Sequence, residues 1–256
     1  MHRQILIAFV FLNQGIAAPL FNGTDLTGFY TWLVDTKYED PRAVFSVTNG
    51  MLRISGDGLG YLATKQEYTN YHLVAEFKWG TTNWHWGNRI GRARDSGIFL
   101  HSAGPDGNSV DGNGAFRAAI ECQIFQGATG DILLIRGTNV APSIAAEVAE
   151  QRDTDSWPFW RRSGTRTNLV GWGRLNWFGK SPAWEDKLDF RSPHDIEKPY
   201  GEWNRIECHS QDGHLEIRLN GVIVNEAFDV HPRSGRILLQ SEGSEIFFRR
   251  LDLEPR

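Results

Sequence analysis

The feature that most constrains the fold of this chain is a series of short strand-like segments joined by two-residue turns. The turn dipeptides are Asn49-Gly50, Asp212-Gly213 and Asn220-Gly221. Asn-Gly and Asp-Gly readily adopt the positive φ values of a type I′ turn, which joins neighbouring antiparallel strands. The segments that they join are 44–47 with 51–54, and 205–210 with 214–219 and 222–225. The last three segments predict a meander of antiparallel strands.

Alternating apolar and polar residues predict further strands, most clearly at 71–79, where one face is apolar and the other mixed. The remaining expected strands are 96–101, 118–125, 131–135, 236–240 and 245–253. Only 144–152 is a modest candidate for an amphipathic helix. Many short strands separated by turns predict an all-β sandwich or barrel. A length of 256 residues is compatible with one large domain of this class.

The first 17 residues have the organisation of a secretory signal peptide. A short basic start precedes an apolar run at 5–12 and small or polar residues at 13–18. This run is too short to span a bilayer, which takes about 20 residues. We expect cleavage after Ala17, which leaves a secreted or periplasmic domain at 18–256. No second long apolar run occurs, so we expect no membrane span.

The net charge, the cysteines and the histidines limit the kinds of partner and cofactor that we expect the chain to bind. The formal net charge of −4 gives no basic footprint for nucleic acid. Cys122 and Cys208 are in phase with apolar neighbours, so both are expected to face a core. An oxidising compartment permits a disulfide between them, and two free thiols are equally compatible with the sequence. No Cys/His spacing is typical of a metal site. Asp95, Glu121, Glu242 and His101 could hold a divalent ion if the fold brings them together, but nothing in their spacing requires one, so we expect no cofactor.

Two stretches lack the regular strand pattern and are rich in Trp and Arg. The shorter is 80–94, and the longer is 136–195. The tryptophans of the longer stretch are Trp157, Trp160, Trp172, Trp177 and Trp184. Long segments without regular structure are usually functional or disordered, and this many tryptophans argue against disorder. We expect 136–195 to be an ordered insertion packed against one end or face of the sandwich.

Several motifs, in order along the chain, resemble one known family. They are Leu20-Phe21-Asn22-Gly23-Thr24-Asp25-Leu26, Leu62-Ala63-Thr64-Lys65-Gln66-Glu67-Tyr68, Asp95-Ser96-Gly97-Ile98-Phe99, Glu121-Cys122-Gln123, Gly201-Glu202-Trp203-Asn204, Leu219-Asn220-Gly221 and Leu239-Gln240-Ser241-Glu242-Gly243. Together they are similar to the 3-keto-disaccharide hydrolase domain family. The resemblance implies a concanavalin A-like jelly roll, in which two sheets form a sandwich. The motifs lie within 20–136 and 196–254, so the Trp/Arg-rich insertion at 136–195 is outside the resemblance.

The strand expected at 118–125 offers the clearest candidate for a sugar site. Alternation places Glu121 and Gln123 on one face and apolar residues on the other. A carboxylate beside an amide on a concave sheet can accept hydrogen bonds from sugar hydroxyls and donate to them. Ordinary glycosidases need two carboxylates, and jelly-roll glucanases commonly place them on one strand in the pattern Glu-x-Asp-x-x-Glu. In this strand the amides Gln123 and Gln126 occupy the positions of the partner carboxylates. Double displacement at this strand is therefore unsupported.

The resemblance implies a chemistry that needs no carboxylate pair. In a 3-keto-glycoside the ketone acidifies the proton on carbon 2, so one base can remove it. The aglycone then leaves carbon 1 by elimination, and water adds to the resulting enone. We expect Glu121 or His101 to be the general base, with Lys65 or Gln123 near the developing oxyanion. By alternation, His101 would share a face with Phe99.

Four further residues are expected to line the same cleft and bind substrate: Asp95, Trp203, Gln240 and Glu242. The predicted function is a secreted hydrolase or lyase that cleaves 3-keto-glycosides by elimination and hydration. A separate sugar 3-oxidoreductase would supply the ketone. The alternative is a non-catalytic carbohydrate-binding module that uses the same concave face, with tryptophans stacking on sugar rings.

Overall fold

The computed structural model describes residues 18–256 apart from residue 87, so the predicted signal peptide at 1–17 lies outside the described residues. The described part of the chain forms β-strands and one short 3₁₀ helix, η1 (Asp111–Gly114), with no α-helix. The strands are β1 (Ala18–Pro19), β2 (Phe29–Leu33), β3 (Phe45–Thr48), β4 (Met51–Ile54), β5 (Gly60–Thr64), β6 (Tyr71–Asn83), β7 (Asp95–Ala103), β8 (Ala118–Phe125), β9 (Ile132–Ile135), β10 (Ser143–Arg152), β11 (Pro158–Trp160), β12 (Thr165–Val170), β13 (Gly173–Leu175), β14 (Asn204–Gln211), β15 (His214–Leu219), β16 (Val222–His231), β17 (Arg236–Ser241) and β18 (Ser244–Pro255). Within the described ranges, no helix has the length and apolar character needed to cross a membrane.

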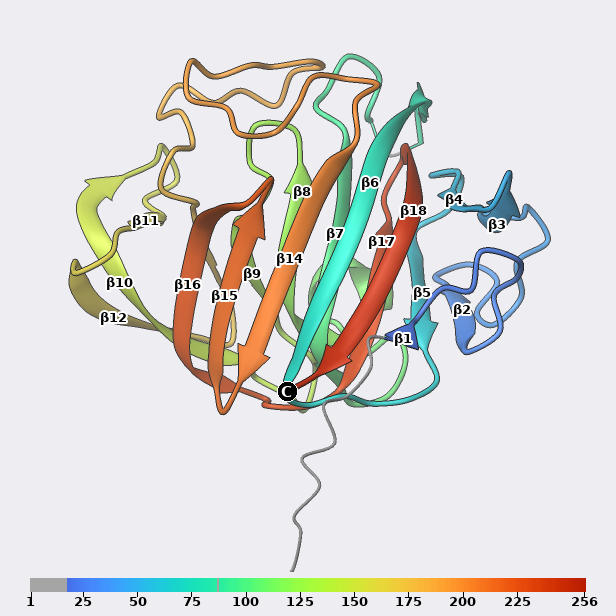
Figure 1. The fold of residues 1–256 in the computed structure, drawn as a ribbon, viewed down its shortest axis with the longest axis horizontal. Helices are drawn as coiled ribbons and strands as arrows, with labels where there is room; N and C mark the ends of the chain where they lie inside the picture. The colour runs from blue at the N-terminus through green and yellow to red at the C-terminus, as the bar shows by residue number, and fades with distance from the viewer. Residues whose placement is uncertain (1–17, 87) are drawn as a thin grey trace, which may run out of the picture.

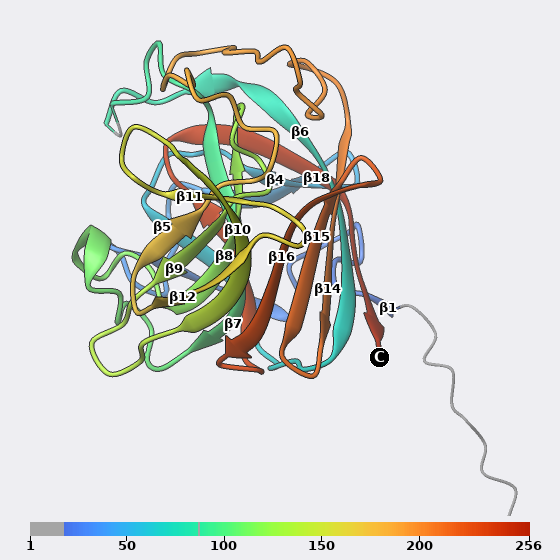
Figure 2. The same cartoon turned by 90° about the vertical axis from the view of Figure 1, so that its left-hand side faces the viewer.

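The strands build two antiparallel sheets that pack against each other (Figure 1). The 11-stranded sheet has the order β11-β10-β16-β15-β14-β6-β18-β4-β3, with β12 beside β10 and β1 beside β18. The 7-stranded sheet has the order β13-β9-β8-β7-β17-β5-β2. In the view turned by 90°, the two sheets lie as two layers (Figure 2). The predicted all-β, two-sheet jelly-roll fold is confirmed.

The hairpin predictions are confirmed at all three turns. β3 pairs with β4, β14 with β15, and β15 with β16, each antiparallel. In every one of these turns both residues have positive φ, for example 51° at Asn49 and 74° at Gly50. This is the conformation for which Asn-Gly and Asp-Gly have the smallest steric penalty.

The expected helix at 144–152 is wrong, because this segment is strand β10. Its buried apolar residues Ile144, Ala146 and Val148 recur every second position and face the core between the sheets. That period is the period of a strand, and β10 is paired on both sides, with β12 and β16. The stretch also supplies β13, which pairs with β9 of the other sheet. The Trp/Arg-rich stretch thus adds strands to both sheets.

The main core lies between the sheets, and a second, smaller apolar cluster lies on the outer face of the 7-stranded sheet. Cys122 of β8 and Cys208 of β14 are both fully buried in the main core, and both are free thiols. The second cluster joins Phe99, Tyr61 and Leu238 to Phe116 of the segment that precedes β8. Since this cluster covers only part of the outer face, the rest of that face is available for polar side chains.

Candidate functional site

Polar side chains from three neighbouring strands meet on the outer face of the 7-stranded sheet. The register pairs Phe99 of β7 with Glu121 of β8, and Gly97 with Gln123. Gln240 of β17 stands on the other side of Gly97, because the preceding residue, Leu239, pairs with Ile98. Glu121 and Gln123 therefore share a face, as alternation predicted, and Gln240 shares it with them.

Gly97 allows these side chains to lie across the middle strand. A Cβ atom at position 97 would lie 2.1 Å from Glu121 Oε1 and 3.1 Å from Gln240 Oε1. The first distance is shorter than any van der Waals contact permits, so only glycine is compatible with this position of the carboxyl group. The two oxygens are consequently brought together above the Gly97 backbone.

Hydrogen bonds and ion pairs connect Asp95, Gln123, Gln240, Glu242 and Arg89, and we call these residues together with the adjacent Glu121 the polar cluster. Gln123 Nε2 donates to Asp95 Oδ1 at 3.0 Å. Arg89 forms ion pairs with Asp95 and, at 3.2 Å, with Glu242. Gln240 Nε2 donates to Glu242 Oε2 at 2.6 Å. Three of the predicted substrate-binding residues, Asp95, Gln240 and Glu242, thus lie with Glu121 and Gln123.

The polar cluster and the neighbouring Arg174 contain several buried atoms that have no hydrogen-bond partner. Glu121 Oε1, Gln123 Oε1 and Gln240 Oε1 are unpaired acceptors. Arg174 Nη2 of β13 is an unpaired donor, while its Nε donates to Asp131 Oδ2 at 2.7 Å. Buried polar groups are nearly always satisfied in folded proteins, so such a concentration of unpaired atoms calls for an explanation. A ligand with hydroxyl groups can satisfy both the unpaired acceptors and the unpaired donor, because a hydroxyl donates and accepts hydrogen bonds.

Burial and like charges raise the pKa values of the carboxyl groups in the polar cluster. Burial raises the pKa of Glu121 well above its ordinary value, and the neighbouring Asp95 and Glu242 add to this, while Arg174 opposes it. Burial and Glu242 likewise raise the pKa of Asp95 well above its usual range, against the opposing charge of Arg89. Closely spaced acids that differ in surroundings can supply a base and an acid to the same reaction.

Two residues expected at the site, Lys65 and Trp203, lie elsewhere. Lys65 is exposed just beyond β5 and borders a hollow lined by the first strand and Tyr68. The Trp203 ring contacts the cationic groups of Lys78 and Arg249, which belong to the 11-stranded sheet and lie 5.0 and 4.5 Å from the ring centroid. Sequence position gave no information on these tertiary placements, since both residues lie next to, rather than inside, a strand.

His101 lies in the core between the sheets, so the expectation that it shares a face with Phe99 is wrong. Its backbone has φ of 52°, and the pairing of β7 with β8 changes register between Leu100 and Ala103. Its Nδ1 donates to the carbonyl of Pro232 at 2.9 Å, and its Nε2 accepts from Ser210 Oγ at 2.9 Å. Burial lowers the pKa of His101 to about 4. A neutral ring with both nitrogens occupied serves the packing of the two sheets.

Sequence reasoning missed Arg89 and Arg174 as site residues. Both lie in the Trp/Arg-rich stretches, where nothing in the local pattern separates them from the other arginines. Their place is set by pairings that span long separations: Arg89 reaches Glu242, and Arg174 stands beside Leu133, the cross-strand partner of Glu121.

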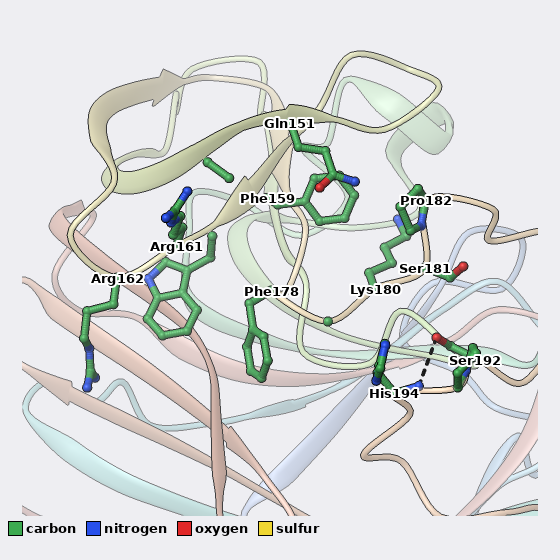
Figure 3. A pocket seen from close by; sticks show the side chains of 14 residues that line it. Gln151, Phe159, Arg161, Arg162, Phe178, Lys180, Ser181, Pro182, Ser192 and His194 are labelled. Carbon is green, nitrogen blue, oxygen red and sulfur yellow. Dashed lines mark hydrogen bonds between the residues drawn. The ribbon is translucent and has the colours of Figure 1, made fainter.

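Hollows lie on both flanks of the polar cluster. One, of about 480 Å³, is lined by Trp84, Trp86 and Asp35, among others. It adjoins the cluster because Trp84 N donates to the carbonyl of Gly243, the neighbour of Glu242, at 2.7 Å. On the other flank Arg174 and Lys180 line a narrow cleft of about 90 Å³. A larger cavity, of about 780 Å³, lies beyond Lys180 (Figure 3).

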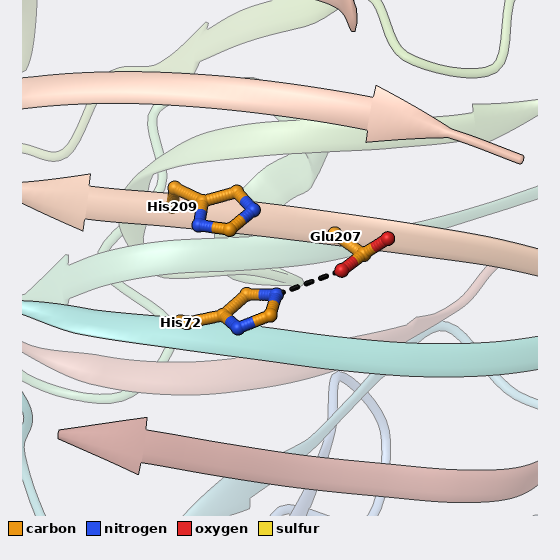
Figure 4. Close-up of side chains that lie close together, drawn as sticks. All are labelled: His72, Glu207 and His209. Carbon is orange, nitrogen blue, oxygen red and sulfur yellow. Dashed lines mark hydrogen bonds and ion pairs between the residues drawn. The ribbon is translucent and has the colours of Figure 1, made fainter. Parts of the chain in front are cut away.

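A separate group of potential metal ligands lies on the outer face of the 11-stranded sheet (Figure 4). Ligand atoms of His72, Glu207 and His209 lie within 4.8 Å of one another. The two imidazole rings are stacked, with centroids 3.9 Å apart and planes inclined by 11°. Because ring nitrogens bind a metal in the ring plane, nearly parallel rings do not converge on one ion. Glu207 also accepts two hydrogen bonds from Arg205, and we interpret the group as a structural network.

Comparisons with known proteins agree with the fold and with a carbohydrate-related function. A family model described as a 3-keto-alpha-glucoside-1,2-lyase-like domain matches residues 17–254, including the stretch at 136–195. Two solved structures from Parabacteroides distasonis ATCC 8503, each described as a "putative glycosyl hydrolase", share the fold. The first has a TM-score of 0.53 and 16% identity, and covers 98% of both chains. The second has a TM-score of 0.50 and 18% identity, and covers 94% of this chain and 100% of its own. No curated protein matches the sequence.

Proposed function

The chain belongs to the 3-keto-alpha-glucoside-1,2-lyase-like domain family, and from this premise we propose that it cleaves 3-keto-glycosides at the polar cluster. The bond broken is the one between carbon 1 of the oxidised sugar and the aglycone oxygen. The reaction begins with removal of the carbon 2 proton and ends with the addition of water.

The steps balance without any redox cofactor. A base takes the proton from carbon 2, and the electron pair of that C–H bond forms an enolate whose charge lies on the carbon 3 oxygen. When the ketone re-forms, a double bond forms between carbons 1 and 2, and the aglycone leaves with the electrons of its C–O bond. An acid protonates the leaving oxygen. Water then adds its hydroxyl to carbon 1 and a proton to carbon 2.

We assign the base to Glu121. Its Oε1 has no other partner, and its surroundings make the carboxylate a stronger base than a solvated one. Arg174 is the nearby cation whose unpaired nitrogen suits the enolate oxygen, a role for which Lys65 lies in the wrong place. Asp95 or Glu242, whose pKa values are also raised, would protonate the leaving group.

The observation that carries this proposal is the set of unpaired buried atoms around Gly97. Acceptors from Glu121, Gln123 and Gln240 lie in one cluster, with a donor from Arg174 near Glu121. A sugar has hydroxyls that can serve both types, whereas an apolar ligand would leave them unpaired. We also propose that the chain is exported, and that a separate sugar 3-oxidoreductase supplies the ketone, because the elimination starts from a sugar that is already oxidised at carbon 3.

The test is release of aglycone from a 3-keto-glucoside by the purified chain. We expect release above the buffer rate, and a fall of at least about a hundredfold for Glu121→Gln, since loss of a general base removes about 10²–10⁴ in rate. Glu67→Gln is the matched control, because Glu67 is exposed and lies outside the cluster.

If Glu121→Gln keeps activity within tenfold, Glu121 is not the base. If the native chain releases no aglycone but binds glycans, and Glu121→Gln abolishes that binding, the alternative carbohydrate-binding module is correct.

A further inference from the structure

The cavity of about 780 Å³ beyond Lys180 is separate from the polar cluster and is formed entirely by residues 149–194 (Figure 3). Its volume lies within the range of about 300–1,000 Å³ that is typical of small-molecule sites. The lining residues are Ala149, Gln151, Phe159, Trp160, Arg161, Arg162, Phe178, Gly179, Lys180, Ser181, Pro182, Ser192, Pro193 and His194. Neither the family resemblance nor the proposed reaction assigns this cavity a role.

One wall of the cavity is aromatic and partly open. The Trp160 and Phe178 rings form an edge-to-face pair with centroids 6.0 Å apart. Phe178 is 47% exposed, which is unusual for a large apolar side chain in a well-packed region. Trp160 is almost fully buried, and its indole N–H has no hydrogen-bond partner. The ring of a ligand could cover Phe178 in this cavity.

The charged residues of the lining are all cationic. Arg161, Arg162 and Lys180 contribute, and none of the lining residues is Asp or Glu. Lys180 is already engaged, because its Nζ donates to Asn176 at 2.6 Å and to Asp131 at 3.3 Å. Arg162 lies 3.8 Å from Glu226. Arg161 alone has no carboxylate within ion-pair distance among the described residues.

We propose that this cavity binds a small organic anion that carries a ring. The ring lies against Phe178, and the carboxylate pairs with the guanidinium of Arg161. Arginine suits this role because its planar group can take a carboxylate with two parallel hydrogen bonds. The ring could be that of a sugar acid, which presents a face of C–H groups, or of an aromatic acid, which presents a planar face, and both carry a carboxylate.

The test measures binding by calorimetry with D-glucuronate and 4-hydroxybenzoate, each beside a neutral counterpart, glucose or phenol. We expect one acid to bind, with the neutral counterpart at least tenfold weaker. Which acid binds identifies the type of ring. Binding of the acid should weaken by at least tenfold in Arg161→Gln, a change of about 1.4 kcal/mol. It should also weaken in Phe178→Ala and with rising salt.

Arg166→Gln is the matched control, because Arg166 is also exposed but pairs with Asp229 outside the cavity. It should bind the acid as the native chain does. The absence of binding by either acid at millimolar concentration, equal binding of acid and neutral compound, or full affinity in Arg161→Gln would each overturn the proposal. Glu121→Gln should leave this binding unchanged, so the outcome is independent of the proposed reaction.

Discussion

Gly97 and Glu121 together determine the geometry of the polar cluster at the level of single residues. The absence of a side chain at 97 lets the Glu121 carboxyl lie across β7, where burial and two neighbouring acids raise its pKa. A side chain elsewhere on this face of β7, such as Phe99, packs against the apolar cluster instead. One glycine thus lies between the polar part of the outer face and its packed part.

Gly97→Ala should disable the site without unfolding the chain. The added methyl group would lie 2.1 Å from Glu121 Oε1, so the carboxyl group must rotate away. The end of a side chain moves more easily than backbone, and we expect little change in the melting temperature. A displacement of this size can cost about a hundredfold in rate. In the Glu121→Gln background, the same substitution should cause no further loss of activity. An active Gly97→Ala variant would contradict the assigned position of the base.

Glu121→Gln should stabilise the fold, increasingly so as the pH rises. The folded-state pKa of Glu121 is raised above the ordinary value of 4.5, so the stability linked to its proton is complete below that pH and is lost as the pH rises. The slope for one proton is about 1.4 kcal/mol per pH unit. Denaturant unfolding of both chains between pH 4 and 8 measures the difference. A constant difference across this range would show that Glu121 titrates normally.

Alternation predicted the shared face of Glu121 and Gln123, because both lie inside one regular strand. The same rule failed for His101, which follows a change of register with positive φ. It could not place Lys65 or Trp203, which lie beside strands, nor could it find Arg89 and Arg174. Such positions depend on contacts between residues far apart in the chain, which periodicity does not encode.

At the scale of elements, turn chemistry predicted the hairpins well, and composition misled at β10. The sequence of β10 is Ser-Ile-Ala-Ala-Glu-Val-Ala-Glu-Gln-Arg, in which alanine and glutamate favour helix. Its neighbours on both sides offer hydrogen bonds that outweigh this preference, as tertiary context commonly does. A local sequence signal is reliable where adjacent residues alone determine the element, as in a two-residue turn.

Two glycine substitutions distinguish the energetic cost of a left-handed turn conformation from that of a collision with neighbouring backbone. Gly221→Ala lies in open space with φ of 85°, so it should cost only the left-handed strain of about 1–2 kcal/mol. Gly60→Ala would place its Cβ 2.0 Å from the carbonyl oxygen of Trp32 in the neighbouring strand, which cannot rotate aside. We expect a much larger loss of unfolding free energy, measured by denaturant titration. Equal losses at the two positions would contradict the close pairing of β2 with β5.

At the scale of the whole molecule, the two cysteines allow the packing of the two sheets against each other to be tested. Cys122 and Cys208 come from opposite sheets, and both are fully buried. Burial and the neighbouring Cys208 thiol raise the pKa of Cys122 well above its usual range. The sequence predicted that both would face the core, but which strands oppose each other across it follows from the complete topology.

Both thiols should be inert in the native chain. We expect no reaction with a disulfide reagent in native buffer, and two thiols per chain after denaturation. The rate of labelling in mild denaturant should follow global unfolding, because a thiolate between the sheets is reached only when they separate. Fast labelling of the native chain would contradict the packing described here.

The strands that the Trp/Arg-rich stretch gives to both sheets have a practical consequence for shortening the chain. β10 covers the edge of β16, and β13 covers the edge of β9. Removing the stretch would uncover hydrogen-bonding edges on two layers at once, and bare edges recruit other chains. A trimmed version would therefore aggregate rather than fold as a smaller monomer, however carefully the cut ends were rejoined.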